Sequence, residues 1–223
     1  MRLPGHIVTF MVIIIFDLGH SKTVHWFKVH CFSGSMESAA LSHQGIIAAT
    51  EAWLINAVIG LNLCPFAKAV HSKKLIRYRV SEARNSDTLL DDLLRELEYL
   101  AEAKPSLVDT TLLIHPWVLT DFLDYNDFLD VADDAIEALD LTGVLQVTSF
   151  HPDYQFADTD FNDMSNFSNR SPYPTLHLLR EESVEQAAAT FPDVASIYEN
   201  NIKTLRNLGA AGWQQVISKD RKP

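Results

Sequence analysis

The chain has 223 residues, of which 47% are apolar and 21% charged, a composition that allows one sizeable hydrophobic core and excludes fibrous, collagen-like and disordered proteins. Its formal net charge of -11 opposes a general phosphate-binding surface, so we expect no nucleic-acid partner. Two cysteines, Cys31 and Cys64, are too few for a disulfide framework, which favours a reducing, cytoplasmic location.

The first 35 residues differ from the rest of the chain. The apolar run 7–16 has the length of a signal-peptide core but is too short to cross a bilayer as a helix, so we expect no membrane span. Asp17 ends the run, and no small-x-small cleavage pattern follows. We interpret residues 1–35 as an N-terminal extension or a weak signal-like segment, with Met36 as an alternative start, followed by one globular domain (36–212) and a C-terminal tail (213–223).

Apolar spacings of three and four residues predict helices, and short alternating or β-branched runs predict strands. In chain order, the pattern predicts a helix over 45–63, a strand over 75–80, a helix over 88–103, a strand over 110–114, a helix over 125–139, strands over 144–150 and 175–179, and helices over 183–189 and 194–208. Strands separated by helices are typical of βαβ crossovers. We therefore expect an α/β fold, with α+β as the alternative. Its mixed, partly parallel sheet of about four strands is covered by helices, in a ferredoxin-like arrangement or a small sandwich.

Three histidines lie in or directly after the predicted strands. His115 and His151 each end a strand before a proline, and His177 lies within one. Polar side chains at the carboxyl ends of neighbouring parallel strands converge on one sheet edge, so His115 and His151 would be neighbours if their strands pair. The alternative is that each histidine caps a strand and donates to a backbone carbonyl.

Cys64 lies in the segment NLCPFAKA, where the first predicted helix ends. A reactive thiolate needs a nearby cation or a helix N-terminus, and a helix C-terminus acts in the opposite direction. The alternative is a buried, inert cysteine. Together, Cys64, His151 and His177 would suit a three-ligand zinc site or a Cys–His catalytic pair. Iron is the other metal considered, and the cofactor is left open.

The polar, aromatic loop 153–174 shows neither helical nor strand periodicity, and such long connections are typical of functional loops. Within it, Arg170 beside Asn169 offers a fork of donors to a carboxylate or phosphate, with an ion pair to a loop aspartate as the alternative. Asp153 and Tyr154 could orient the His151 imidazole or supply acid–base groups.

Tyr173 and His115 complete the substrate-binding candidates, beside Arg170 and Asn169. The sequence contains no Gly-rich phosphate loop, GxSxG elbow, HExxH or CxxC motif, so we expect no nucleotide cofactor.

Three segments, GLNLCPFAKA, VTSFHPDYQF and NRSPYPTLHLLREESVEQA, together resemble the domain-of-unknown-function family 1415 over about residues 46–208. The resemblance implies a soluble, single-domain protein and carries no mechanism. The matched positions are Cys64, Pro65, Phe66, His151, Pro152, Tyr154, Asn169, Arg170, Ser171, Pro172, Tyr173, Pro174, His177 and Arg180.

Three hypotheses follow. The leading one is an enzyme acting on a small anionic substrate, with His151 and His177 as acid–base or metal-binding groups, Cys64 as ligand or nucleophile, and Arg170 positioning the anion. The second is a non-catalytic module that binds a small ligand or a partner through the loop 153–174. The third is that this loop is structural, held by its asparagines and Arg170. The reaction and the oligomeric state are left open.

Overall fold

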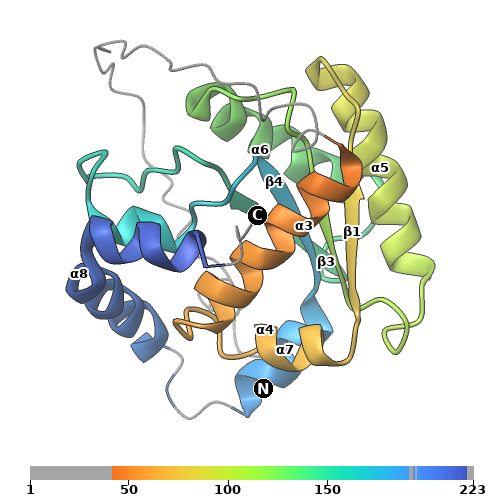
Figure 1. Ribbon diagram of the computed structural model, residues 1–223. Helices are drawn as coiled ribbons and strands as arrows, with labels where there is room; N and C mark the ends of the chain where they lie inside the picture. Colours follow the sequence, from red (N-terminus) through yellow and green to blue (C-terminus); the bar gives the residue numbers. More distant parts are fainter. Residues whose placement is uncertain (1–41, 191–192, 194, 220–223) are drawn as a thin grey trace.

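A computed structural model describes residues 42–190, 193 and 195–219 (Figure 1). The expectations for residues 1–35, including Cys31, lie outside the described residues. One four-stranded sheet, in the order β1-β2-β4-β3, forms the centre of the described part.

The sheet consists of β1 (Ile76–Val80), β2 (Thr110–Ile114), β3 (Leu145–Phe150) and β4 (Thr175–Arg180). β1 and β2 are parallel, whereas β4 is antiparallel to β2 and to β3. The four predicted strands are thus confirmed to within one residue at each end, and the sheet is mixed and partly parallel, as expected.

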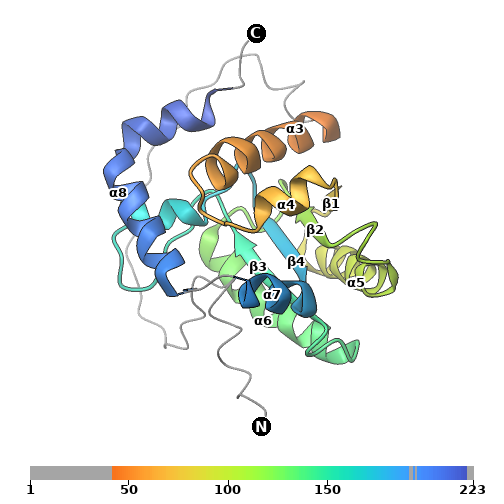
Figure 2. The same ribbon diagram turned by 90° about the horizontal axis from the view of Figure 1, so that it is seen from below.

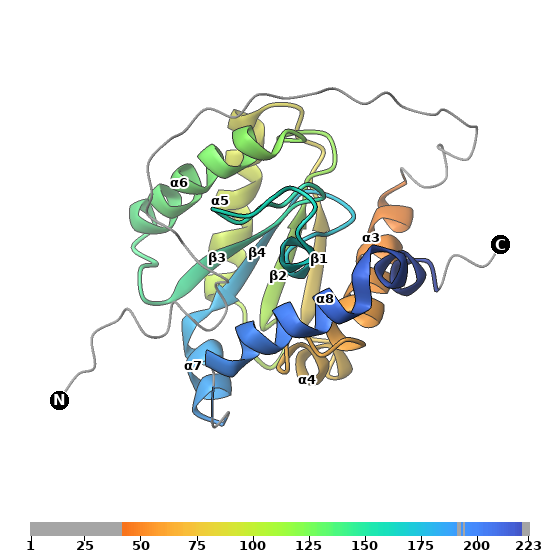
Figure 3. The ribbon, with the colours of Figure 1, turned by 90° about the vertical axis from the view of Figure 1, so that its left-hand side faces the viewer.

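Helices surround the sheet in the described part of the chain: α3 (His43–Trp53), the π-helix η1 (Leu54–Ile59), α4 (Ala67–Ser72), α5 (Ser86–Glu102), α6 (Phe122–Ala138), the 3₁₀-helix η2 (Met164–Ser168), α7 (Glu181–Ala189) and α8 (Ala195–Ile217). The α/β class is confirmed. Two successive strand–helix units followed by the β3–β4 pair differ from the β-α-β-β-α-β order of a ferredoxin-like fold. Helices on both faces of the sheet make the arrangement a sandwich (Figures 2 and 3).

One face of the sheet, the outer face, is covered by α5 and α6 (Figure 3). Helical spacing places Leu89, Leu93, Leu97 and Leu100 of α5 on one stripe, and all four are fully buried. Burial of each such leucine stabilises the fold by about 1.5–3 kcal/mol. The helix begins at the cap Asn85, whose side chain accepts a hydrogen bond from the backbone of Thr88 at 2.9 Å.

The opposite face, the inner face, is covered by α3, η1 and α8 (Figure 2). Trp53, Leu205 and Trp213 are buried in this layer. Gly209, predicted to close the last helix, interrupts α8 with a non-helical φ of 66° that glycine adopts without strain, and a further helical segment follows to Ile217. Burial of Trp213 holds this second half on the core, so helix and core extend past the boundary expected at residue 212.

None of the helices within residues 42–190 and 195–219 is long and apolar enough to cross a bilayer.

Candidate functional site

Four polar side chains from three strands share the inner face of the sheet: Thr110, Gln146, Thr148 and His177, here called the inner-face polar cluster. His177 on β4 lies directly opposite Thr148 on β3. Two residues further along, Leu179 of β4 lies between Thr110 and Gln146. Because opposed and alternate residues of a sheet point to the same side, the four side chains lie under η1 and α8 rather than under α5 and α6.

Hydrogen bonds determine the tautomer of His177. The Thr110 hydroxyl donates to the carbonyl oxygen of Leu178 at 2.6 Å, and it lies 2.7 Å from Nε2 of His177. Since a hydroxyl has one proton to donate, Nε2 of His177 donates to Thr110. Burial lowers the pKa of His177 to about 4, so the ring is neutral near pH 7 and its Nδ1 is left as a hydrogen-bond acceptor. The side chain is only partly buried, although it lies at mid-sheet.

Several polar atoms of this face are buried without a hydrogen-bond partner among the described residues. They are Nε2 of Gln146, Oγ1 of Thr148 and the hydroxyl of Tyr78. Tyr78 lies in the same row of the sheet as His177, with Leu112 between them. An unpaired buried polar atom costs about 1–3 kcal/mol, and such atoms are therefore rare in folded proteins. Two of them belong to β3, which pairs with the strand of His177, and the third lies two strands away, so this face has donors and acceptors left to meet other polar groups.

Aromatic side chains border the cluster. The Phe150 ring lies 5.9 Å from the His177 ring and 5.2 Å from that of Trp53, measured between centroids. Trp53 is the last residue of α3, immediately before the π-helix η1. Sequence reasoning predicted an ordinary helix here, but the amide of Gly60 bonds to the carbonyl of Ile55, five residues back. π-helical turns occur frequently at functional sites.

Cys64 lies in the same layer, packed against the cluster that contains Trp53 and that Phe150 and Tyr78 also contact. Burial raises the pKa of its thiol, whereas hydrogen bonds from the backbone of Phe66 and Ala67 act to lower it. Those groups belong to the start of α4, which the sequence analysis did not predict. The thiol therefore faces the beginning of a helix as well as following the end of another.

His115 and His151 do not lie on adjacent strands, because β4 lies between β2 and β3. Both strands nevertheless run in the same direction, and the two rings contact the ring of Tyr125, at centroid distances of 5.6 Å and 5.1 Å. The Tyr125 hydroxyl donates to the carbonyl of Thr175 and accepts from the amide of Phe150. The two histidines therefore lie close together as expected, and the ring of Tyr125 contacts both of them.

Both ring nitrogens of His151 form hydrogen bonds with the backbone. Its Nδ1 accepts from the amide of Asp153 at 3.0 Å, and its Nε2 donates to the carbonyl of Leu119 at 3.2 Å. His115 donates from Nδ1 to the carbonyl of Val118, while its Nε2 has no partner among the described residues and is fully enclosed. Burial is the main cause that lowers the pKa of both rings, to about 4 for His115. This geometry matches the capping alternative for His151.

Arg170 is engaged within its own loop. Its Nε donates to the carbonyl of Tyr154 at 3.2 Å and a terminal nitrogen donates to that of Phe161 at 2.6 Å. The guanidinium also lies between the rings of Phe161 and Phe167, 4.5 Å and 4.3 Å from their centroids. Carbonyl and aromatic contacts, rather than the ion pair considered as the alternative, hold this guanidinium, and Asp153 acts on it only electrostatically.

The other loop candidates likewise have internal partners. Asn169 donates to the carbonyl of Ser149, and Tyr154 is buried with hydrogen bonds to Ser149 and Asn169. The Tyr173 carbonyl accepts from the hydroxyls of Ser171 and Thr175.

The structure thus does not gather the three residues that could have formed a metal site, because His151 lies apart from Cys64 and His177. Cys64 lies in the layer over the inner face, His177 on that face and His151 against Tyr125 at the sheet edge. Among the residues that the structure describes, no group of three His, Cys, Asp or Glu side chains is placed to hold a metal ion.

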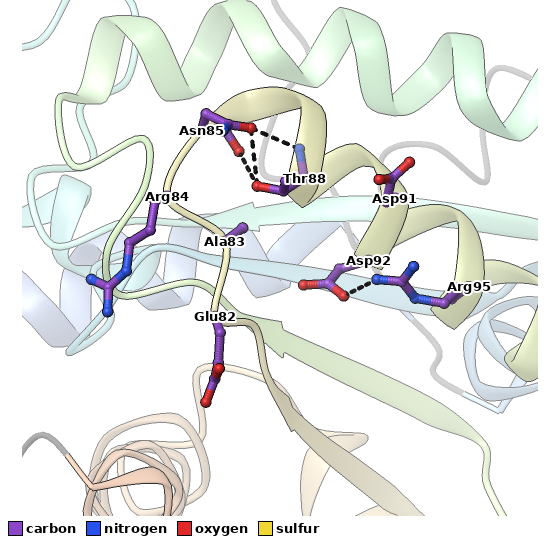
Figure 4. A pocket seen from close by; sticks show the side chains of 8 residues that line it. All are labelled: Glu82, Ala83, Arg84, Asn85, Thr88, Asp91, Asp92 and Arg95. Carbon is purple, nitrogen blue, oxygen red and sulfur yellow. Dashed lines mark hydrogen bonds and ion pairs between the residues drawn. The ribbon is translucent and has the colours of Figure 1, made fainter.

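A hollow of about 330 Å³ lies elsewhere, where β1 leads into α5 (Figure 4). Charged side chains of both signs line it, and Asp92 is paired with Arg95. It contains none of the residues that the sequence analysis singled out.

Sequence reasoning missed Tyr78, Thr110, Gln146 and Thr148. The run VLQVTSF does alternate apolar and polar residues, a period normally assigned to a strand with one face in water. The available signal was the expectation that helices cover the sheet, which places polar side chains of this strand under a helical layer.

The fold and this face define a mixed α/β protein with a polar cluster beneath a π-helical segment. The chain belongs to a family described as protein of unknown function, DUF1415, whose family model matches residues 45–215 and confirms the resemblance of the three segments. No curated protein and no solved structure matches the chain.

Proposed function

We propose that the protein binds a small polar ligand on the inner face of its sheet, with Gln146, Thr148 and His177 as ligand-binding residues. One observation carries the proposal: buried atoms of Gln146 and Thr148 have no partners among the described residues, on the strand that pairs with the strand of His177, and Thr148 lies directly opposite His177. Ligand sites combine apolar walls with a few convergent polar groups. Phe150 and Trp53 supply such walls here.

This proposal keeps His177 from the sequence-based candidates and replaces the rest of the set. An anionic substrate held by Arg170 gains no support, because that guanidinium donates to two carbonyls and contacts two aromatic rings. The same contacts support the hypothesis that the loop 153–174 is a structural element.

A second candidate function is catalysis at the same face by Cys64 and His177. It is favoured by the two backbone amides that bond to the Cys64 sulfur and by the acceptor Nδ1 of neutral His177. Such a thiol and imidazole could serve as nucleophile and base.

Alkylation by iodoacetamide separates this second function from simple binding. In a Cys31→Ser background, catalytic coupling predicts that His177→Gln slows alkylation of Cys64 at least about tenfold. Equal alkylation rates in the two proteins would contradict catalysis by Cys64 and His177 and would not affect the ligand-binding proposal.

Binding itself is tested by NMR on ¹⁵N-labelled protein with acetamide, acetate, glycerol, benzamide, benzoate and benzamidine as probes. The proposal predicts that at least one probe shifts the Thr148 and His177 amides saturably, and that Thr148→Val weakens this binding. Thr111→Val is the matched control, because Thr111 is also buried and unpartnered but points to the outer face. Shifts confined to other parts of the protein, or none, would contradict the proposal.

A further inference from the structure

The hydrogen-bonding groups of the inner face restrict the chemistry of the ligand, and this inference rests on the proposed function. Nε2 of Gln146 can only donate, and Nδ1 of His177 can only accept while the ring is neutral. The hydroxyl of Thr148 can either donate or accept a hydrogen bond. A ligand that satisfies all three must carry an acceptor and a donor close together.

Among the described residues, the sheet itself offers no charged side chain on the inner face to pair with a charged ligand. From α3 above this face, the Glu51 carboxylate helps raise the pKa of Tyr78, but Tyr78 lies two strands away from the strand of His177. Among the described arginines of the sheet, Arg77 and Arg79 alternate to the outer face, where both lie within ion-pair distance of Glu96. Arg180 also points outward, and it donates to carbonyls at the end of α5. Burial of a charge without a partner is strongly unfavourable. The cluster therefore favours an uncharged ligand.

The aromatic rings beside His177 restrict the shape of the ligand. The Phe150 ring is tilted by 37° to the His177 ring and meets the Trp53 ring edge-on at 70°. Flat, apolar surfaces of this kind suit a planar group that stacks or packs edge-on.

We infer that the ligand is an uncharged, planar amide-type molecule, whose carbonyl oxygen accepts from Gln146 and Thr148 and whose N–H donates to Nδ1 of His177. The carbonyl and N–H of one amide are adjacent, as the direct pairing of Thr148 with His177 requires. Phe150 lies against the body that carries this amide.

Three probes of nearly equal shape separate the charge states: benzamide is neutral, benzoate is an anion and benzamidine is a cation. We expect benzamide to bind at least about tenfold more tightly than either ion near pH 7.5, from NMR titrations of the Thr148 and His177 amides. Gln146→Leu and Thr148→Val should each weaken benzamide at least about fivefold, whereas Thr111→Val should not.

These titrations test the ligand site on the inner face and the amide chemistry of its ligand separately. Tighter binding of benzoate or benzamidine at the same amides would overturn the amide assignment and leave the proposed site standing. Equal benzamide affinity in wild type, Gln146→Leu and Thr148→Val would overturn the assignment of these donors. Shifts of these amides by acetate or glycerol alone would overturn the amide inference and leave the proposed site standing, whereas no shift by any of the six probes would overturn both.

Discussion

At the residue scale, the two unpartnered threonines allow a direct comparison. Thr111 is fully buried on the outer face and Thr148 is nearly so on the inner face, and neither hydroxyl has a partner among the described residues. Replacement by valine keeps the shape and removes an unsatisfied polar atom, so we expect each variant to gain about 1 kcal/mol in free energy of unfolding, measured with urea. Only Thr148→Val should also lose probe binding. A loss of stability in both variants would show that these hydroxyls are paired in solution.

Arg170 is the residue whose assigned role changes most between sequence and structure. Lysine keeps its charge but cannot reproduce the fork that reaches the carbonyls of Tyr154 and Phe161, so Arg170→Lys should lower the free energy of unfolding by about 1–3 kcal/mol. The control Arg206→Lys, at an exposed pair with Asp163, should cost less than about 1 kcal/mol. Unchanged stability of Arg170→Lys together with lost probe binding would instead make Arg170 a ligand-binding residue.

At the element scale, the π-helix η1 shapes the layer over the inner face. Gly60 follows it, and a Cβ atom at this position would collide with the carbonyl oxygen of Asn56, a backbone atom that moves only with the helix. We therefore expect Gly60→Ala to lower the free energy of unfolding by at least about 1 kcal/mol. Alanine in place of glycine usually stabilises a helix, so this effect has the opposite sign. Thermal unfolding measures the effect, with Gly143→Ala as a control for strain from positive φ in open space. An increase in melting temperature for Gly60→Ala would show that η1 can relax to an ordinary helix without cost.

At the scale of the whole molecule, buried neutral histidines make stability depend on pH. The pKa of His177 lies at about 4 in the folded protein and near 6.5 when unfolded, so the unfolded state binds more protons between these values. Stability is therefore complete above about pH 6.5 and falls as the pH drops toward about 4. Between about pH 7 and pH 5, the free energy of unfolding, measured with urea, should fall by about 2 kcal/mol less in His177→Gln than in the wild type. Equal slopes for His177→Gln and wild type would contradict the buried neutral ring.

Sequence patterns predicted the fold of this molecule better than its candidate site. Periodicity alone located the strands, because alternation in β1 and β-branched runs in β2 and β3 are local properties. The position of β4 between β2 and β3 depends on long-range pairing, and no local signal placed His177 opposite Thr148. His177 was identified because three histidines lie in or directly after the predicted strands, whereas the threonines and the glutamine of the strands formed no such pattern.

The tautomer and ring chemistry of His177 test the central claim most directly. Long-range ¹H–¹⁵N NMR of histidine-labelled protein near pH 7 should show a neutral ring protonated on Nε2, with an unprotonated Nδ1 resonance that shifts when benzamide is added. A charged ring, a proton on Nδ1, or an Nδ1 resonance that none of the probes moves would contradict a ligand site centred on this residue.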